Sequence, residues 1–255
     1  MKITRKEFLR GVLVAAAATL SGAGTRAATD AGTGGTDTGD PPAVPRWGMA
    51  IDVQKCRWDE GCSQCIQACV LAHNIPAVPD PAHDVKWIWK ASYEAVFPQQ
   101  SPWIKPDLAS HPLVLMCNHC TNPACVRVCP TDATWKRDDG IVMMDWHRCI
   151  GCRYCMAACP YGSRSFNFSD PRPDVANINP AYPTREKGVV EKCTFCEERL
   201  ARGAGPACVE TCPQNALSFG DLNDRTSAIR SQLRTRYAMQ RLPELGAGPA
   251  VYYLL

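Results

Sequence analysis

The chain has 255 residues, of which 45% are hydrophobic and 21% charged, and its formal net charge is +3. This length allows a hydrophobic core that does not depend on disulfides. The nearly balanced charge lacks the basic excess of a nucleic-acid-binding protein, so nucleic acid is not an expected partner. The unusual feature of the composition is its sixteen cysteines.

The first 27 residues have the composition of an export signal. A basic start precedes an apolar stretch over residues 11–20 and small residues up to Ala27. This stretch is too short to span a bilayer, which indicates a signal peptide, with an uncleaved anchor as the alternative. Residues 4–10 (TRKEFLR) resemble a twin-arginine signal, with Lys6 in the place of the second arginine. We therefore expect a periplasmic protein that is peripheral on the membrane through its partners.

Residues 28–45 are rich in Gly, Thr, Asp and Pro, which predicts a flexible linker. A domain is predicted over residues 46–220. It starts with a strand over 47–53 and a helix over 69–73. A long insertion, residues 76–112, contains a predicted strand, DVKWIWK, that places Trp87 and Trp89 on one face. The insertion either covers the domain's own core or docks a partner.

Further strands are predicted over residues 113–117, 141–144, 189–193 and 216–220, and Asp139-Gly140 predicts a hairpin turn before the second of them. The repeated order of strand, cysteine loop, short helix and strand indicates a duplicated module. The cysteine run CIGCRYCMAACP, residues 149–160, resembles that of bacterial ferredoxins. The predicted fold class is therefore α+β, with duplicated bacterial ferredoxin-like modules, loop insertions and little regular secondary structure. Residues 221–255 are predicted to form a helix over 227–240, with Ile229, Leu233 and Tyr237 on one face. A tail follows that either contacts a partner or closes a sheet edge.

The cysteines fall into four groups of four, three of which end in Cys-Pro: Cys56/Cys62/Cys65/Cys69, Cys117/Cys120/Cys125/Cys129, Cys149/Cys152/Cys155/Cys159 and Cys193/Cys196/Cys208/Cys212. The third group, CIGCRYCMAACP, has the spacing of a bacterial [4Fe–4S] ferredoxin. An iron–sulfur cube needs four soft thiolates, and two-residue spacers let one loop present two or three of them. The fourth cysteine lies four residues later and is placed to ligate the neighbouring cluster. The sequence therefore predicts four [4Fe–4S] clusters, with all sixteen cysteines as iron ligands.

Two other uses of the cysteines are a disulfide framework and structural zinc, and the repeated CxxC and CxxxCP spacing favours neither. Basic residues beside the ligands either offset the negative charge of the clusters and raise their potentials or are ordinary surface charges: Arg127, Arg148, Arg153 and Lys192. His119 and His147 either tune a cluster or are structural. The sequence shows no catalytic triad or phosphate loop. Together with the predicted clusters, this indicates a non-catalytic electron-transfer subunit without a small-molecule substrate of its own.

Over residues 46–255 the four cysteine groups, in this order, resemble the four-cluster ferredoxin subunits of bacterial membrane redox complexes. These include the B-type subunits of dimethyl-sulfoxide, polysulfide and tetrathionate reductases and a nitrite-reduction subunit. The resemblance implies that the first group pairs with the fourth and the second with the third, each exchanging its last cysteine. The implied ligand sets are set A (Cys56, Cys62, Cys65, Cys212), set B (Cys193, Cys196, Cys208, Cys69), set C (Cys117, Cys120, Cys125, Cys159) and set D (Cys149, Cys152, Cys155, Cys129).

Three segments further resemble the exported ferredoxins of DsrMKJOP-type complexes, which are linked to dissimilatory sulfite reductase: DVKWIWKASYEAVFP, the run from GIVMMDWHRCIGC to MAACPYGSRSFNF, and KGVVEKCTFC. The implied partners are an NrfD-type polytopic quinone-interacting membrane subunit, a multihaem cytochrome c and other subunits of the complex. One alternative is the ferredoxin subunit of a molybdopterin-containing reductase or of a nitrite-reduction system. Another is a metal-stapled structural module without a redox role.

Overall fold

The computed structural model describes residues 44–57, 61–99 and 104–255. The predicted signal peptide and residues 28–43 of the predicted linker lie outside the described residues. Among the helices that are described, none has both the length and the apolar character that a bilayer crossing requires.

The largest sheet has four strands in the order β8-β1-β10-β9. Strand β1 (Trp47–Asp52) pairs antiparallel with β8 (Leu217–Asp221) on one side and parallel with β10 (Val251–Leu254) on the other. β10 in turn pairs antiparallel with β9 (Ala238–Met239). Met49 therefore lies between Phe219 and Val251, and strands from both ends of the described chain build one sheet.

Six further strands form three antiparallel pairs, β2 (Ile88–Ser92) with β3 (Pro112–Met116), β4 (Thr134–Lys136) with β5 (Val142–Met144), and β6 (Ser165–Phe166) with β7 (Val190–Glu191). In each pair, the strand that follows one cysteine group joins the strand that leads into the next group. The β8–β1 pair closes the series, because β8 follows the fourth group and β1 leads into the first. This arrangement confirms the predicted α+β fold class of repeated ferredoxin-like modules.

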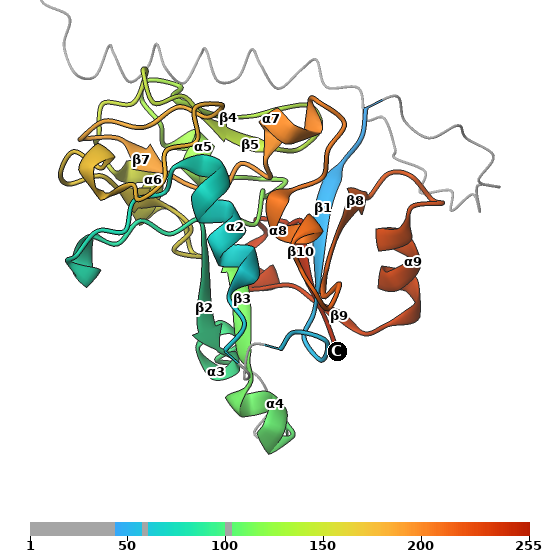
Figure 1. Ribbon diagram of the computed structural model, residues 1–255. Coiled ribbons are helices and arrows are strands. Elements are labelled where there is room, and N and C mark those ends of the chain that lie inside the picture. The colour runs from blue at the N-terminus through green and yellow to red at the C-terminus, as the bar shows by residue number, and fades with distance from the viewer. Residues whose placement is uncertain (1–43, 58–60, 100–103) are drawn as a thin grey trace, which may run out of the picture. The chain divides into compact units, whose positions relative to one another are not determined.

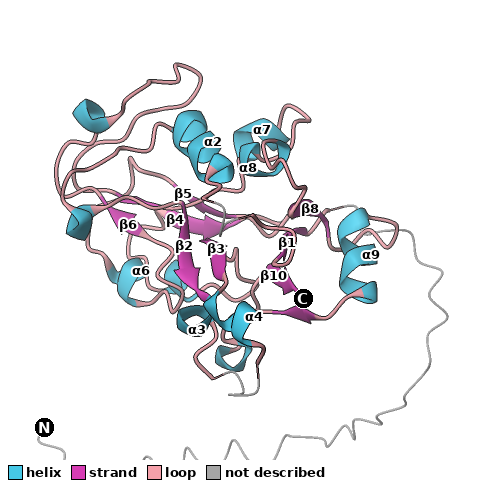
Figure 2. Ribbon diagram, turned by 60° about the horizontal axis from the view of Figure 1, so that its bottom comes forward, coloured by secondary structure: helices cyan, strands magenta, loops and turns pink. Residues whose placement is uncertain are grey.

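The helices are short, and the third cysteine of every group lies on one of them: α2 (Gln64–His73), α5 (Ala124–Arg127), α6 (Tyr154–Ala157) and α8 (Ala207–Glu210). Figures 1 and 2 both show α2 beside α8, and the two helices are in contact. The helix predicted over residues 69–73 is wrong in its start. It begins at Gln64, because the backbone N–H groups of Ile66 and Gln67 bond back to the carbonyl of Ser63 and add a turn before Cys69. The other short elements are η1 (Pro81–His83), α3 (Tyr93–Val96), α4 (Pro106–Ser110), η2 (Arg172–Asp174), α7 (Glu197–Leu200), α9 (Ala228–Thr235) and η3 (Pro243–Leu245).

The insertion over residues 76–112 contributes to the main hydrophobic core. Trp87, Tyr93 and Val96 are each no more than 2% exposed and pack in one cluster with residues of β1, β3 and β10. Cys69, Cys117, Cys193 and Cys208 belong to the same cluster. The described part of the insertion therefore covers the protein's own core, and apolar side chains and thiols share that core.

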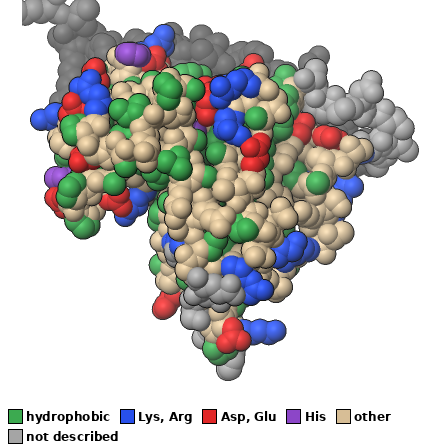
Figure 3. Space-filling model, viewed as in Figure 1, with side chains coloured by type: hydrophobic (Ala, Val, Ile, Leu, Met, Phe, Trp, Pro, Cys, Tyr) green, Lys and Arg blue, Asp and Glu red, His purple; other side chains and the backbone are tan. Residues whose placement is uncertain are grey.

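The C-terminal region differs from its prediction. Helix α9 ends at Thr235 and not at residue 240, because Arg236 is extended and leads the backbone into β9. Ile229 is buried as expected, but Tyr237 is 70% exposed. The tail, left open between a partner and a sheet edge, forms β10 between β1 and β9, so it lies inside the sheet. On the face shown in Figure 3, basic and acidic side chains are interspersed.

Candidate metal centres

One backbone feature recurs in all four cysteine loops. The residue directly before the second cysteine of each group has a positive φ: 82° at Gly61, 40° at His119, 69° at Gly151 and 56° at Phe195. A left-handed residue in such a loop turns successive backbone N–H groups to one side, which creates a concavity suited to an anion. His119 and Phe195 adopt a conformation that is uncommon outside glycine, so the surrounding loop imposes it.

A second repeat follows the three Cys-Pro pairs. The third residue after the cysteine has a φ of 51° at Asp132, 65° at Gly162 and 48° at Asn215. The second, third and fourth cysteine groups therefore share their turn geometry as well as their spacing, which is the backbone counterpart of the repeat in the sequence.

Gly151 is held close to a neighbouring segment. A Cβ atom added there would lie 2.4 Å from the carbonyl oxygen of Gly188, and its φ is positive. A side chain at this position would displace the loop that carries Cys149 and Cys152, so glycine is required here.

Sulfur atoms from the first and fourth cysteine groups lie together. Burial raises the pKa of Cys65 to about 11, and the further causes are the thiols of Cys56, Cys212 and Cys62. Burial also raises the pKa of Cys69 well above its usual value, with contributions from Cys193, Cys208 and Cys196. The structure thus brings Cys212 to the first group and Cys69 to the fourth.

Sulfur atoms from the second and third groups also lie together. Burial, followed by the thiols of Cys117, Cys125 and Cys159, raises the pKa of Cys120 to about 12. Cys155 packs in a small cluster with Cys129 and Cys149, which also includes Cys125. Cys152 is the one exposed residue among the sixteen cysteines, all of which the structure describes, and no disulfide joins any of them.

Cysteines of different ligand sets also lie close to one another. Cys65 is an electrostatic neighbour of both Cys69 and Cys208. Cys117 has the largest electrostatic effect of any side chain on Cys193 and packs in the same core cluster, and Cys125 acts on Cys155 in a second cluster. These contacts connect the four ligand sets in the order A, B, C, D.

Backbone amides point at several of these sulfur atoms. The N–H groups of Phe195, Ala207 and Ala216 donate to the Sγ atoms of Cys193 (3.4 Å), Cys196 (3.4 Å) and Cys212 (3.3 Å). Grouped thiols with raised pKa values are costly to ionise in the absence of metal, and bound iron removes that cost because it takes thiolate as ligand. Soft sulfur donors, amide donors and burial together fit multiple [4Fe–4S] clusters.

The two histidines singled out in the sequence differ. His119 is fully buried, stacks on Phe195 with ring centroids 3.7 Å apart, and accepts a hydrogen bond at Nδ1 from the N–H of Val142 (3.0 Å). Burial, and then Lys192 and Arg46, hold the pKa of His119 well below its usual value, so it is neutral. His147 is exposed.

His73 was not singled out, although it lies one helical turn after Cys69. Its Nδ1 lies 3.0 Å from the carbonyl oxygen of Cys69, and its Nε2 lies 3.2 Å from Oε1 of Glu198. Burial lowers the pKa of His73, but Cys196 and Glu198 outweigh burial and raise it to about 9. The i, i+4 spacing from a predicted ligand was the signal available in the sequence.

The four basic residues that lie beside predicted ligands in the sequence are in two different environments. Arg127, Arg148 and Arg153 are exposed, whereas Lys192 is completely buried. A further cation, Arg164, is only 5% exposed. The sequence did not indicate it, because it does not lie beside a cysteine. Of the predicted cations beside the ligands, only Lys192 therefore acts from the protein interior.

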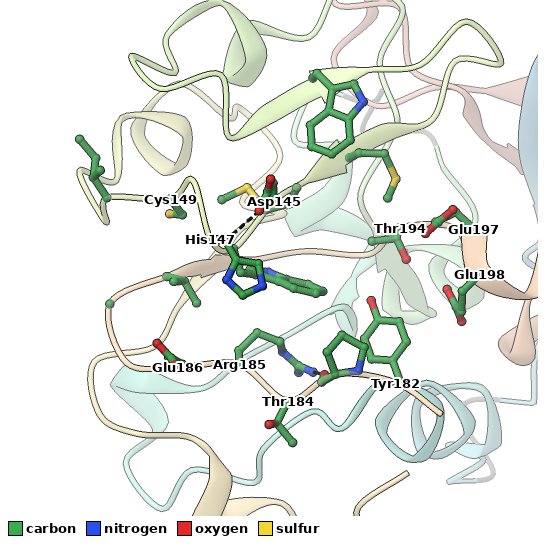
Figure 4. A pocket seen from close by; sticks show the side chains of 18 of the residues that line it. Asp145, His147, Cys149, Tyr182, Thr184, Arg185, Glu186, Thr194, Glu197 and Glu198 are labelled. Carbon is green, nitrogen blue, oxygen red and sulfur yellow. Dashed lines mark hydrogen bonds between the residues drawn. The ribbon is translucent and has the colours of Figure 1, made fainter. Parts of the chain in front are cut away.

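A cavity of about 810 Å³ opens between Cys149 and Glu198 (Figure 4). Its walls come from residues 143–150, residues 181–189 and the start of α7. Figure 4 shows Arg185 and Tyr182 on one side of it and His147 on another, where the backbone N–H of His147 donates to Oδ1 of Asp145 (2.9 Å). Glu197 at its rim pairs with Arg137 at 2.9 Å.

Comparison with known proteins supports the metal assignment. A family model described as "4Fe-4S dicluster domain" matches residues 111–171 and 177–222. The chain is 41% identical over 228 residues to the "Hdr-like menaquinol oxidoreductase iron-sulfur subunit 1" of Archaeoglobus fulgidus, covering 82% of each chain. It is 39% identical over 232 residues to the "Menaquinone reductase, iron-sulfur cluster-binding subunit" of Nitratidesulfovibrio vulgaris, covering 82% of this chain and 88% of the relative.

A subunit of a tetrathionate reductase is similar as well. Identity to the B-type subunit of the tetrathionate reductase of Salmonella typhimurium is 36% over 211 residues, which covers 82% of this chain and 72% of that relative. The relatives thus include two proteins whose names refer to menaquinol or menaquinone and one whose name refers to tetrathionate reductase.

Proposed function

This chain belongs to the 4Fe-4S family of iron–sulfur electron-transfer subunits of membrane-associated oxidoreductase complexes, and we propose that it carries four clusters and relays electrons through them without a catalytic site of its own. Sets A, B, C and D would each hold one cluster. The clusters, when bound, supply one-electron redox chemistry. The protein supplies the thiolates and the amide donors to sulfur, and it buries six of the sixteen cysteines.

The observation that carries this proposal is the contiguity of the four sets. The main core cluster contains Cys117 of set C with Cys69, Cys193 and Cys208 of set B, and Cys65 of set A packs against it. Cys125 of set C packs in a second cluster with Cys155 of set D. Electron transfer between cofactors needs a short path, and a row of adjoining ligand sets supports one. The proposed route runs through the sets in the order A, B, C, D or in the reverse direction.

For the complex, we propose a DsrMKJOP-type assembly in sulfur metabolism. In it, the chain would exchange electrons with an NrfD-type quinone-interacting membrane subunit and a multihaem cytochrome c. Two relatives whose names refer to menaquinol or menaquinone support a quinone-linked role. The proposed location is periplasmic, after export by the twin-arginine route. That route carries folded proteins and would suit clusters inserted in the reducing cytosol.

The second candidate is the ferredoxin subunit of a molybdopterin-containing reductase. The similarity to the tetrathionate reductase component favours it. In that case the chain would pass electrons to or from a molybdenum-containing catalytic subunit.

The metal content of the native complex separates these candidates. The complex is purified from its own membranes through a tag on this chain, and c-type haem and molybdenum are assayed per chain. We expect c-type haem that becomes reduced on addition of a menaquinol analogue, and no molybdenum. Stoichiometric molybdenum without haem would favour the reductase instead.

A further inference from the structure

Two cations lie in the protein interior between the cysteine loops. Arg164 follows the third cysteine group, just before β6, and is 5% exposed. Lys192 directly precedes Cys193 and is 0% exposed. A buried charge is costly unless an opposite charge or strong hydrogen bonds compensate for it.

The hydrogen bonds of these cations are to neutral groups. Arg164 donates to Oγ1 of Thr134 at 2.8 Å, and Lys192 donates to the carbonyl oxygens of Val142 and Cys193. Within the described residues, neither cation forms an ion pair with a carboxylate. Arg185 shows the contrast, because it is equally buried and pairs with Glu191 at 2.7 Å. A buried carboxylate thus compensates the charge of Arg185, whereas no carboxylate of the described residues pairs with Arg164 or Lys192.

Cysteine thiols act on both cations instead. Those with the largest electrostatic effect on Arg164 are Cys125, Cys155 and Cys117. Nη1 of Arg164 also donates to Sδ of Met144 at 3.6 Å, and Met144 packs in one cluster with Cys155 and Cys125. The thiols that act on Lys192 are Cys117, Cys193 and Cys125. Cys117 and Cys125, both of set C, are common to the two cations. Burial, and then repulsion from Arg164, lower the pKa of Lys192, so an anion beside both cations would stabilise their charges.

A cluster held by four thiolates is such an anion. Its net charge is about −2 when oxidised and about −3 when reduced. A fixed positive charge beside it stabilises the reduced form more than the oxidised form, and low surrounding polarity strengthens the effect. Exposed cations such as Arg148 act through water and are screened.

We propose that Arg164, together with Lys192, is the internal counter-charge of set C and raises the reduction potential of the cluster held there above those of its neighbours. This inference rests on the proposed function, because it requires clusters in sets B, C and D. Arg164 would contribute a fixed positive charge and would not take part in the redox chemistry itself. Electrons that enter the protein would then reside mainly on the cluster of set C. Set D receives a smaller effect through Cys155.

The test is a potentiometric titration followed by low-temperature EPR on the intact protein, in which the signal lost from Cys117→Ala/Cys120→Ala is assigned to the cluster of set C. In Arg164→Met, we expect the ratio of reduced to oxidised cluster at set C to fall about tenfold at a fixed potential, equal to a shift of about 59 mV for one electron. Lys192→Met should shift the same cluster in the same direction. Arg164→Lys keeps the charge and should restore most of the ratio. Arg148→Met, which removes an exposed cation beside Cys149, is the matched control and should change little.

The outcomes separate the inference from the proposed function. Unmodified protein without [4Fe–4S] signals would end both. If Arg164→Met keeps its iron and titrates like the unmodified protein, the inference is overturned and the proposed function stands. If Arg164→Met loses iron, Arg164→Lys decides. If Arg164→Lys retains its iron, the positive charge is what matters, and the inference is supported. If Arg164→Lys loses as much iron as Arg164→Met, Arg164 has a role in packing only, and the inference is overturned.

Discussion

The double variant Cys117→Ala/Cys159→Ala is expected to lose one cluster, about four irons, whereas Cys155→Ala/Cys159→Ala is expected to lose two, about eight irons. The reason is the exchange of the last cysteine between groups. Cys159 is a neighbour of Cys120 in set C, although it lies four residues after Cys155, which packs with Cys149 of set D. Two changes within one set remove the same cluster, and changes in two sets remove two.

Iron and acid-labile sulfide per chain, measured on anaerobically purified protein, give the result. Cys149→Ala/Cys155→Ala is the control, because both cysteines belong to set D and only one cluster should be lost. Without exchange, the pattern would be inverted. Cys155→Ala/Cys159→Ala would then lose one cluster and Cys117→Ala/Cys159→Ala two.

Removal of the buried carboxylate in Glu191→Ala should lower the free energy of unfolding by about 3–5 kcal/mol. Glu191 and Arg185 are both completely buried and pair at 2.7 Å, and Glu191 also accepts hydrogen bonds from Trp87 (3.0 Å) and Asn167 (2.5 Å). The guanidinium of Arg185 lies 5.6 Å from the ring centroids of both Trp87 and Trp146. The variant would leave Arg185 charged and unpaired among these rings.

Thermal unfolding under anaerobic conditions should show a midpoint lowered by roughly 6–20 °C for Glu191→Ala. Asp170→Ala is the matched control, since it breaks an arginine–carboxylate pair of 2.6 Å whose side chains are about half exposed. Water screens such a surface pair, so its loss should change the midpoint little. Equal unfolding midpoints for the two variants would show that the buried ion pair stabilises the fold no more than the exposed one.

The cysteine loops and the strands around them could be predicted because their signals are local. Cysteine spacing, the Asp139-Gly140 turn and short apolar runs each determine the structure of a few neighbouring residues. The parallel pairing of Met49 with Val251 could not be predicted, because it depends on residues from opposite ends of the described chain. Periodicity predicted too long a C-terminal helix for a similar reason, since strand pairing takes the backbone away at Arg236.

The electrostatic environment of the candidate centres was the least predictable part. Position beside a cysteine suggested four cations, but only Lys192 is buried. The guanidinium of Arg164 donates to Thr134, which belongs to another module and lies 30 residues away in the sequence. Burial of a charge depends on which segments meet in the fold, and a single sequence does not show those meetings.

The most direct test of the central claim is the content of iron and acid-labile sulfide in protein purified without oxygen, combined with EPR after dithionite reduction. Four clusters predict about sixteen irons and about sixteen sulfides per chain, with magnetically interacting [4Fe–4S]⁺ signals. A product with zinc in place of iron, or with its cysteines joined in disulfides and no labile sulfide, would contradict the account.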